Sequence, residues 1–212
     1  MIKLHKGAAP EILTDNATTW TVELLQEIAA GGDQVAYRKG KYNKPSIKDA
    51  IKKETNCKCA YCEAQPLHVT YGDIEHIIPK SIQPELTFDW ENLTLACDVC
   101  NTKKGNQEGL LDPYDCEPSE EFAFYGPMIL HIDRRAGAEL TRTILDLNRI
   151  ELLSKRKDRI DALANLFRRL ETHPDDYERE LLIRASLAHE TKDESEFAAC
   201  ARSYLTNAGY HF

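Results

Sequence analysis

The sequence predicts an α+β protein in which a small module of short strands lies between two helical regions. Two observations predict it. Apolar residues recur with helical spacing at both ends of the chain, whereas the segment after Cys57 turns to β-branched and aromatic residues. We therefore divide the 212 residues into an N-terminal helical arm with a basic segment at 1–56, a module at 57–112, and a helical C-terminal region at 113–212.

Two helices are expected in the N-terminal arm. Residues 19–30 place apolar side chains four positions apart on one face, and two successive glycines end the run. A second helix is expected to begin with Ser46 as its N-cap, because Asp49 stands three residues later, as in a capping box with Asp in place of Glu. Its apolar residues would face the interior and its lysines the solvent.

Short strands and turns are expected in the module. Residues 68–71 and 74–78 are rich in β-branched and aromatic side chains, and Pro79 limits the second of these strands. Residues 98–104 favour a helix that carries Cys100 near its start. The module is therefore mixed in secondary structure, unlike the regions on either side.

The C-terminal region is expected to be mostly helical, apart from a short strand segment at 122–132. From Glu139 onward apolar residues recur at intervals of three, four or seven. Pro174 breaks this helical pattern, and the acidic pair 175–176 opens the next helix. The last helix is expected at 193–205.

Four of the seven cysteines form two pairs of equal spacing, Cys59 with Cys62 and Cys97 with Cys100. Two thiolates three positions apart on a tight turn can face one ion, and two such turns complete a tetrahedral shell of four sulfurs. The pairs therefore predict a Zn²⁺ site. Because a filled shell leaves no open position, this zinc would be structural. The alternatives are two disulfides, which a reducing cytoplasm disfavours, or buried thiols that bind no metal.

Three cysteines stand outside these pairs. Cys57 lies beside the first pair and is an alternative ligand to Cys59, which we prefer because its spacing to Cys62 mirrors the second pair. Cys116 and Cys200 stand alone and are expected to behave as small hydrophobic residues.

The formal net charge is −8, and an acidic chain argues weakly against a nucleic-acid partner, because phosphate binding needs clustered cations. The charge is unevenly distributed, however. Residues 38–58 hold eight basic and two acidic side chains, a local charge of +6, whereas residues 115–212 carry −5. The basic segment is either a phosphate-contacting surface or a solvated helix face.

No apolar run is long enough for a transmembrane helix, which needs about 18 residues. The first residues also lack the continuous apolar segment of a secretory signal. We therefore expect a cytoplasmic protein with no membrane association.

The residues between the two cysteine pairs carry further chemistry. Glu75 and His76 fall in a predicted strand, Asn92 precedes a leucine, and Asn101 directly follows the last cysteine of the second pair. This order resembles the HNH nucleases, whose ββα-metal site is held by two such cysteine pairs. The resemblance implies a ββα-metal module, stapled by the four-cysteine zinc site, that hydrolyses nucleic-acid phosphodiester bonds.

The resemblance also implies a role for each of these residues. His76 would be the general base that deprotonates a water, a task suited to an imidazole near neutral pH. Glu75 and Asn101 would bind a catalytic Mg²⁺ or Mn²⁺ through oxygen atoms. Asn92 would position the loop and the imidazole. The family often has His where this chain has Asn101, which leaves the metal preference open.

Other residues near this motif are expected to take part in binding. Asp73 shares a strand face with Glu75, so it is either a further metal ligand or a bystander. Nucleic-acid contacts are expected from five lysines, namely Lys52, Lys53, Lys80, Lys103 and Lys104.

Over the whole chain the layout is similar to the PtuB-type nucleases, which act in the Septu anti-phage system and also beside retrons. The features that carry this resemblance are the opening MIKLHKGAAPEIL, the KCAYCE segment, the nuclease motif and the downstream TILDLNRIELLSKR. It implies a hetero-oligomer with an ABC/SMC-like ATPase of the PtuA type that controls the nuclease. The helical C-terminal region at 113–212, which includes residues 143–149, would be the docking surface for that partner or, alternatively, its helices are simply core of the same domain.

Two other functions compete with the nuclease. A non-catalytic zinc module that binds nucleic acid or protein needs the same four thiols but not Glu75, His76 or Asn101. A zinc hydrolase of small molecules fits least well, because the four-thiolate shell has no open position. The sequence leaves open whether the substrate is DNA or RNA.

Overall fold

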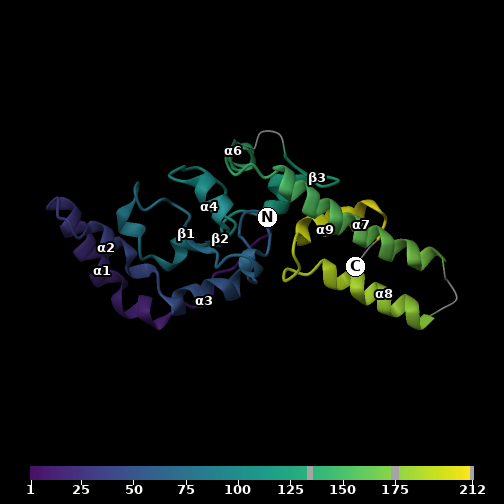
Figure 1. The fold of residues 1–212 in the computed structure, drawn as a ribbon, viewed down its shortest axis with the longest axis horizontal. Coiled ribbons are helices and arrows are strands. Elements are labelled where there is room, and N and C mark those ends of the chain that lie inside the picture. The colour runs from purple at the N-terminus through teal and green to yellow at the C-terminus, as the bar shows by residue number, and fades with distance from the viewer. Residues whose placement is uncertain (133–135, 173–176, 211–212) are drawn as a thin grey trace.

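The computed structural model describes residues 1–132, 136–172 and 177–210, and the molecule is elongated (Figure 1). Its helices and strands confirm the predicted α+β class, with helices on both sides of a central module. The helices are α1 (Glu11–Ala29), α2 (Val35–Lys39), α3 (Pro45–Glu54), α4 (Asp98–Lys104), α5 (Pro118–Glu121), α6 (Ala136–Ile144), α7 (Ile150–Thr172), α8 (Tyr177–Glu190) and α9 (Ala198–Asn207). The strands are β1 (Asp73–His76), β2 (Leu93–Ala96), β3 (Phe122–Tyr125) and β4 (Met128–His131), and four 3₁₀ turns are η1 (Gly40–Tyr42), η2 (Pro66–His68), η3 (Pro84–Leu86) and η4 (Trp90–Asn92).

Both helices expected in the N-terminal arm form, but they start elsewhere. Helix α1 begins eight residues earlier than predicted, directly after Pro10, because Leu13 also packs into the core. Helix α3 begins at Pro45 and its N-cap is Lys44, so the prediction of Ser46 as N-cap is wrong. The proline ring fixes φ at a helical value and lacks the N–H that a cap would satisfy, which places Pro45 at the first helical position.

The module has a ββα arrangement. Strands β1 and β2 pair antiparallel, with Asp73 opposite Ala96 and His76 opposite Leu93. Helix α4 follows at once, as predicted, and carries Cys100 in its first turn. The predicted strand at 68–71 is wrong. Pro66 starts a 3₁₀ turn there, and Val69 and Tyr71 are 74% and 87% exposed, so no buried face holds the segment extended.

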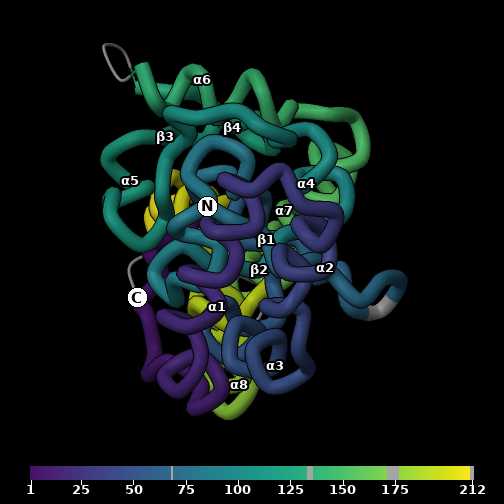
Figure 2. Tube along the Cα trace, turned by 90° about the vertical axis from the view of Figure 1, so that its left-hand side faces the viewer, coloured from purple at the N-terminus to yellow at the C-terminus, as the bar shows by residue number. Residues whose placement is uncertain are grey.

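The C-terminal region combines a hairpin with helices. Strands β3 and β4 pair as an antiparallel hairpin in the predicted strand segment, and Figure 2 shows this hairpin beside α6. The last helix begins at Ala198, five residues later than predicted, because Phe197 has a left-handed φ of 54°. The predicted break at Pro174 and the helix opening at 175–176 lie outside the described residues.

The buried core crosses the boundaries of the three predicted parts. Leu24 of α1 and Ile51 of α3 pack with Leu93 and Leu95 of β2 in one cluster. The cysteine pairs form a second cluster with apolar residues of the hairpin and of the C-terminal helices. The module therefore shares a core with each flank, and the division into three parts stays a prediction.

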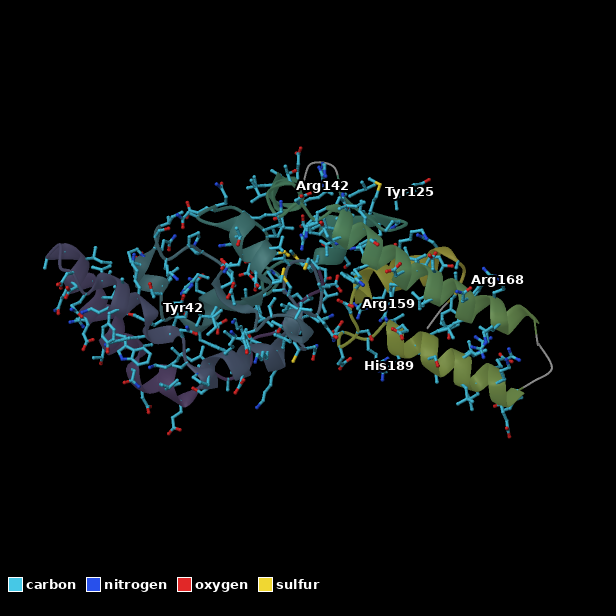
Figure 3. All side chains as sticks on the ribbon, in the orientation of Figure 1. Tyr42, Tyr125, Arg142, Arg159, Arg168 and His189 are labelled. Atoms are coloured by element: carbon cyan, nitrogen blue, oxygen red, sulfur yellow. The ribbon has the colours of Figure 1, made fainter. Side chains whose placement is uncertain are left out.

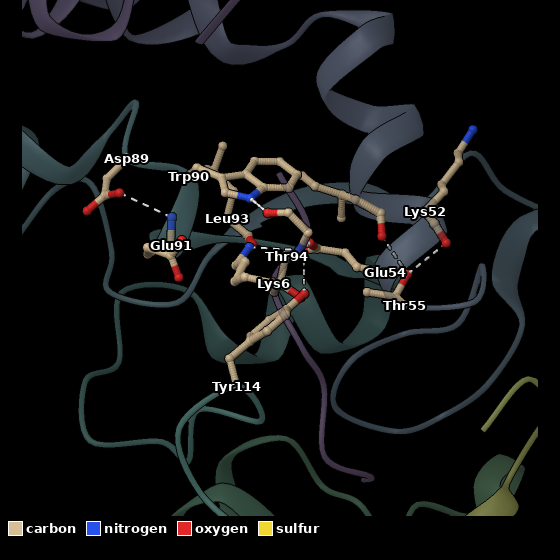
Figure 4. A network of polar contacts seen from close by, with 12 residues as sticks. Lys6, Lys52, Glu54, Thr55, Asp89, Trp90, Glu91, Leu93, Thr94 and Tyr114 are labelled. Atoms are coloured by element: carbon tan, nitrogen blue, oxygen red, sulfur yellow. Dashed lines mark hydrogen bonds and ion pairs between the residues drawn. The ribbon is translucent and has the colours of Figure 1, made fainter. Parts of the chain in front are cut away.

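A buried polar network joins the first residues of the chain to the module (Figure 4). The Lys6 ammonium donates to the carbonyl of Leu93, pairs with Glu54 at 3.0 Å, and lies 4.4 Å from the centre of the Trp90 ring. The Tyr114 hydroxyl donates to the same Glu54 carboxylate at 2.8 Å. Burial of a charge is favourable only with such partners, so this network fixes the segment before α1 against β2.

In the part of the chain that the structure describes, no helix is both long enough and apolar enough to span a bilayer.

Candidate active site and metal centre

The four paired cysteines come together as predicted. The sulfurs of Cys59, Cys62, Cys97 and Cys100 all lie within 4.8 Å of one another, and those of Cys62 and Cys97 are 3.9 Å apart. A tetrahedral zinc with Zn–S bonds of about 2.3 Å requires sulfur separations of about 3.8 Å. The donor set and its spacing therefore fit a zinc ion. Cys57 is exposed and lies outside this cluster.

Local backbone structure brings the two pairs together. The first pair stands on a tight turn in which the Glu63 amide donates to the Cys59 carbonyl at 3.0 Å. The Ala60 amide donates to the carbonyl of Leu95 at 2.8 Å, which fixes this turn beside β2. Cys97 stands where β2 ends and is the N-cap of α4, its sulfur accepting from the Cys100 amide at 3.4 Å. The ββα geometry thus follows from the sequence around each pair.

His76 is held as a neutral imidazole. Its ring is 4% exposed, and Nε2 lies 3.0 Å from the carbonyl oxygen of Thr87. Because a carbonyl can only accept, Nε2 carries the proton, which leaves Nδ1 as the basic atom. Burial lowers the His76 pKa to about 4, and the charges of Lys80 and Lys104 act in the same direction. At neutral pH the ring is therefore uncharged, with its lone pair on Nδ1.

Asn92 acts on His76 through the intervening loop. Its Oδ1 accepts from the Ile78 amide at 2.7 Å, and its Nδ2 donates to the carbonyls of Ile78 and Leu86 at 3.0 and 3.1 Å. These three bonds tie both ends of the loop to one side chain. The Thr87 carbonyl that holds the imidazole directly follows Leu86. The geometry supports a positioning role for Asn92.

Glu75 points to the opposite face of β1 from His76, as strand alternation requires. It is buried, and its carboxylate pairs with the Lys104 ammonium at 2.7 Å. Burial raises the pKa of Glu75, while Lys104 opposes that rise. Lys104 is 1% exposed and also donates to the His76 carbonyl at 2.7 Å. The lysine therefore lies inside the site and not on its surface.

Asp73 and Asn101 also meet at this face. The Asn101 amide nitrogen donates to Asp73 Oδ2 at 2.7 Å, which leaves the amide oxygen to face a cation. Asp73, Glu75 and Asn101 together offer carboxylate and amide oxygens, the donor types that Mg²⁺ prefers. Their chemistry fits a hard divalent ion. Asn101 thus contacts Asp73, whose charge also acts on Glu75, the neighbour with which it was expected to share a strand face.

Tyr42 of η1 covers the other side of the His76 ring. The two rings meet edge to face, with their centres 4.6 Å apart. The Lys80 ammonium lies 2.7 Å from the Tyr42 hydroxyl. Figure 3 shows Tyr42 in the half of the molecule that contains the N-terminal helices. The N-terminal arm thus contributes directly to the site.

The other predicted lysines lie in different surroundings. Lys103 pairs with Asp146 at 3.1 Å and is partly exposed. Lys52 pairs with Asp49 at 3.7 Å, and Lys53 is exposed on the same helix, α3. In the described residues neither α3 lysine has a contact with Glu75, His76 or Asn101. Of the five lysines, Lys80 and Lys104 are therefore the ones that the structure brings to the site.

Sequence reasoning missed two residues of the site and left a third unexamined. Thr87 acts through its backbone carbonyl, which no residue type signals. Tyr42 stands within the basic segment at 38–58, where the lysines and not the aromatic ring suggested a function. Tyr61, between the first two cysteines, has a buried hydroxyl that lacks a hydrogen-bond partner among the described residues. Burial raises the pKa of Tyr61, and the charge of Glu75 contributes to that rise.

The chain is similar in sequence to known proteins. The HNH endonuclease family model matches residues 59–107. Two proteins named Septu protein PtuB are similar to the chain. The one from Bacillus thuringiensis is 30% identical over 158 residues, which cover 72% of this chain and 57% of that protein. The one from Bacillus mycoides (strain KBAB4) is 26% identical over 196 residues, which cover 74% of this chain and 66% of that protein.

The chain thus spans between 57% and 66% of the length of these two relatives. The family match falls on the segment that contains both cysteine pairs and the ββα elements. Residues 59–107 therefore match the HNH endonuclease family, and the chain that carries them is similar to the Septu protein PtuB.

Proposed function

We propose that the chain is a metal-dependent nuclease that hydrolyses phosphodiester bonds of nucleic acid, with His76 as the general base. The observation that carries this proposal is the His76 ring itself. It is buried and neutral, and its Nε2 is bonded to the Thr87 carbonyl, so that Nδ1 can accept a proton. A buried, neutral imidazole that is oriented through one ring nitrogen leaves the other nitrogen to accept a proton from a water.

His76 Nδ1 takes the proton of the attacking water, while the Thr87 carbonyl keeps the ring oriented through Nε2. Asn92 keeps that carbonyl in place by fixing the loop at Ile78 and Leu86. Attack at phosphorus leaves a 5′-phosphate on one product and a 3′-hydroxyl on the other.

Glu75 and Asn101, with Asp73 as a candidate further ligand, would hold the catalytic divalent ion, Mg²⁺ or Mn²⁺. When bound, such an ion polarises the phosphate and stabilises the leaving oxygen. Burial raises the pKa of Glu75, and the positive charge of Lys104, 2.7 Å away, opposes that rise and favours the ionised carboxylate. Structural Zn²⁺ in the four-cysteine site holds the frame on which these residues stand.

Lysines around the site would contact the phosphates of the nucleic acid. Lys80 stands beside Tyr42 and contributes to the charge around His76. Lys103, Lys52 and Lys53 extend the positive surface away from the centre. A chain with a net charge of −8 holds nucleic acid weakly unaided, because affinity rises with the number of neutralised phosphates.

This weak hold supports dependence on a partner. The relatives are named as proteins of the Septu system. We propose that this chain is the effector nuclease of an anti-phage defence complex and that an ABC/SMC-like ATPase of the PtuA type delivers and controls it. The docking surface would lie in the C-terminal region at 113–212, but it would not include Leu145 and Leu147, which are fully buried.

The test is cleavage by the chain co-purified with its ATPase partner. Labelled DNA and RNA are incubated with Mg²⁺ or Mn²⁺, and the ends of the products are identified by enzymatic labelling. We expect 5′-phosphate and 3′-hydroxyl ends, no cleavage with EDTA, and no cleavage by His76→Ala. Cys57→Ser is the matched control and is expected to cleave like wild type, because its side chain is exposed and outside the zinc cluster.

The competing function, a non-catalytic zinc module, predicts a different result. Wild type and His76→Ala would then bind nucleic acid equally, and neither would cleave it with any metal. That outcome would overturn the nuclease proposal and leave the zinc site untouched.

A further inference from the structure

Arg149 makes an unusual contact with the four-cysteine cluster. Its Nη2 lies 3.7 Å from the Cys100 sulfur and 4.0 Å from the Cys97 sulfur. Its Nη1 donates to the carbonyls of Leu145 and Asp146 at 3.2 and 3.4 Å. The guanidinium is therefore fixed at both ends, on the turn between α6 and α7 and on the second cysteine pair.

The contact places the positive charge of Arg149 beside sulfurs that would carry negative charge around a bound zinc. Four thiolates around one Zn²⁺ leave a net charge of about −2. The cysteines are at most 8% exposed, and a buried net charge is unfavourable without a compensating partner. A guanidinium supplies a positive charge and N–H donors that point to two sulfurs at once. Among the described residues, Arg149 is the cation that hydrogen-bonds this cluster.

The side of the cysteine cluster that is nearest to solvent also lies beside Arg149. A hollow of about 920 Å³ borders the cluster, and Cys97, Val99, Arg149, Ile150 and Phe197 are among the residues that line it. Cys97 is the most exposed of the four cysteines, at 8%. Arg149 thus lies where a chelator or water would reach the nearest zinc ligand.

The contact also crosses between two parts of the chain. Cys97 and Cys100 belong to the module, whereas Arg149 belongs to the C-terminal region. Leu145 and Leu147, on the same turn, are fully buried in the cluster of apolar residues that includes the cysteines. Lys103 also reaches this turn, through Asp146 at 3.1 Å, but that ion pair is partly exposed and contacts no sulfur.

We propose that Arg149 is part of the zinc centre: it hydrogen-bonds two ligand sulfurs, offsets their charge, and makes zinc binding fasten the C-terminal region to the nuclease module. This inference rests on the proposed zinc in the four-cysteine site. The TILDLNR segment, residues 143–149, then connects the C-terminal region to the nuclease module.

The first experiment measures zinc affinity by competition with a chromophoric chelator. Arg149→Met keeps the length of the side chain and removes its charge, and we expect zinc binding about 10–100-fold weaker. Arg149→Lys keeps the charge but lacks the planar fork of the guanidinium, so its zinc affinity should lie between those of wild type and Arg149→Met. Lys103→Met is the matched control, since it removes a cation from the same interface without a sulfur contact, and its affinity should match wild type.

The second experiment measures hydrogen exchange of residues 145–152 with and without zinc. In wild type, zinc removal should speed exchange there as well as in residues 97–104. In Arg149→Met, exchange of 145–152 should be faster than in wild type even with zinc bound, whereas Lys103→Met should behave like wild type.

The outcomes separate the two claims. If Arg149→Met and Arg149→Lys both bind zinc as tightly as wild type, the role of Arg149 is refuted while the zinc site stands. If zinc removal leaves exchange of 145–152 unchanged, the fastening role is refuted. If wild type binds no zinc at all, the zinc site itself is wrong and the inference falls with it. None of these measurements depends on nuclease activity.

Discussion

The buried, neutral state of His76 has a direct consequence for stability at acid pH. An unfolded histidine has a pKa of about 6.5, whereas burial lowers the pKa of His76 to about 4. The unfolded chain therefore binds a proton at this position in a pH range where the folded protein does not. Its contribution to stability is complete above pH 6.5 and is lost as the pH falls from 6.5 towards 4.

The size of the loss follows from the same two pKa values. A difference of about 2.5 pKa units corresponds to about 3.4 kcal/mol once the pH lies below both. At pH 5 the loss is about 2 kcal/mol. No discount for solvent screening is needed, because His76 is 4% exposed.

The assay compares wild type with His76→Gln, which keeps hydrogen-bonding capacity but has no group that titrates in this range. Urea unfolding is measured at pH 7.5 and pH 5.0 with the same free zinc concentration. Between these pH values, wild type should lose about 2 kcal/mol more than the variant. Protonation of the cysteines or of Glu75 affects both proteins alike and cancels in the comparison. Equal losses would refute the account of His76 as a buried neutral base.

Three further predictions concern the residues around His76. Asn92→Ala leaves buried backbone groups of the loop without partners and should destabilise the protein by about 3 kcal/mol in urea unfolding, with cleavage reduced as well. Lys104→Met removes the charge that opposes the raised pKa of Glu75, so cleavage should fall more at pH 6 than at pH 8 in a pH–rate profile. Cys97→Ser should abolish zinc binding and speed hydrogen exchange across the module, whereas Cys57→Ser should leave both unchanged.

A specific result would contradict each of these predictions. Full stability of Asn92→Ala would mean that the loop is held by other contacts. A uniform loss of activity in Lys104→Met at all pH values would show that Lys104 does not act through the ionisation of Glu75. Zinc retained at wild-type affinity in Cys97→Ser would exclude this cysteine as a ligand.

Spacing explains why the sequence predicted that the four paired cysteines come together. A CxxC pair constrains the local turn strongly, so the choice of Cys59 over Cys57 needed only the comparison with the second pair. The strand that carries Glu75 and His76 was predictable from the same kind of local pattern. Local pattern was sufficient wherever neighbouring residues set the geometry.

Contacts between distant segments could not be predicted in this way. Lys104 was expected to contact phosphate, but its side chain turns inward to Glu75, since a buried carboxylate needs a partner. Tyr42 reaches His76 only because the N-terminal arm folds onto the module. The strand expected at 68–71 failed because β-propensity depends on a buried face, which Val69 and Tyr71 do not have.

The most direct test of the central claim is the cleavage rate of His76→Ala relative to wild type, both zinc-loaded, folded and bound to the ATPase partner, at pH 7.5 with Mg²⁺. If His76 is the general base of a nuclease, the variant should cleave at least about 100-fold more slowly while it retains zinc and binds nucleic acid as wild type does. Cleavage at the same rate in both proteins would contradict the account.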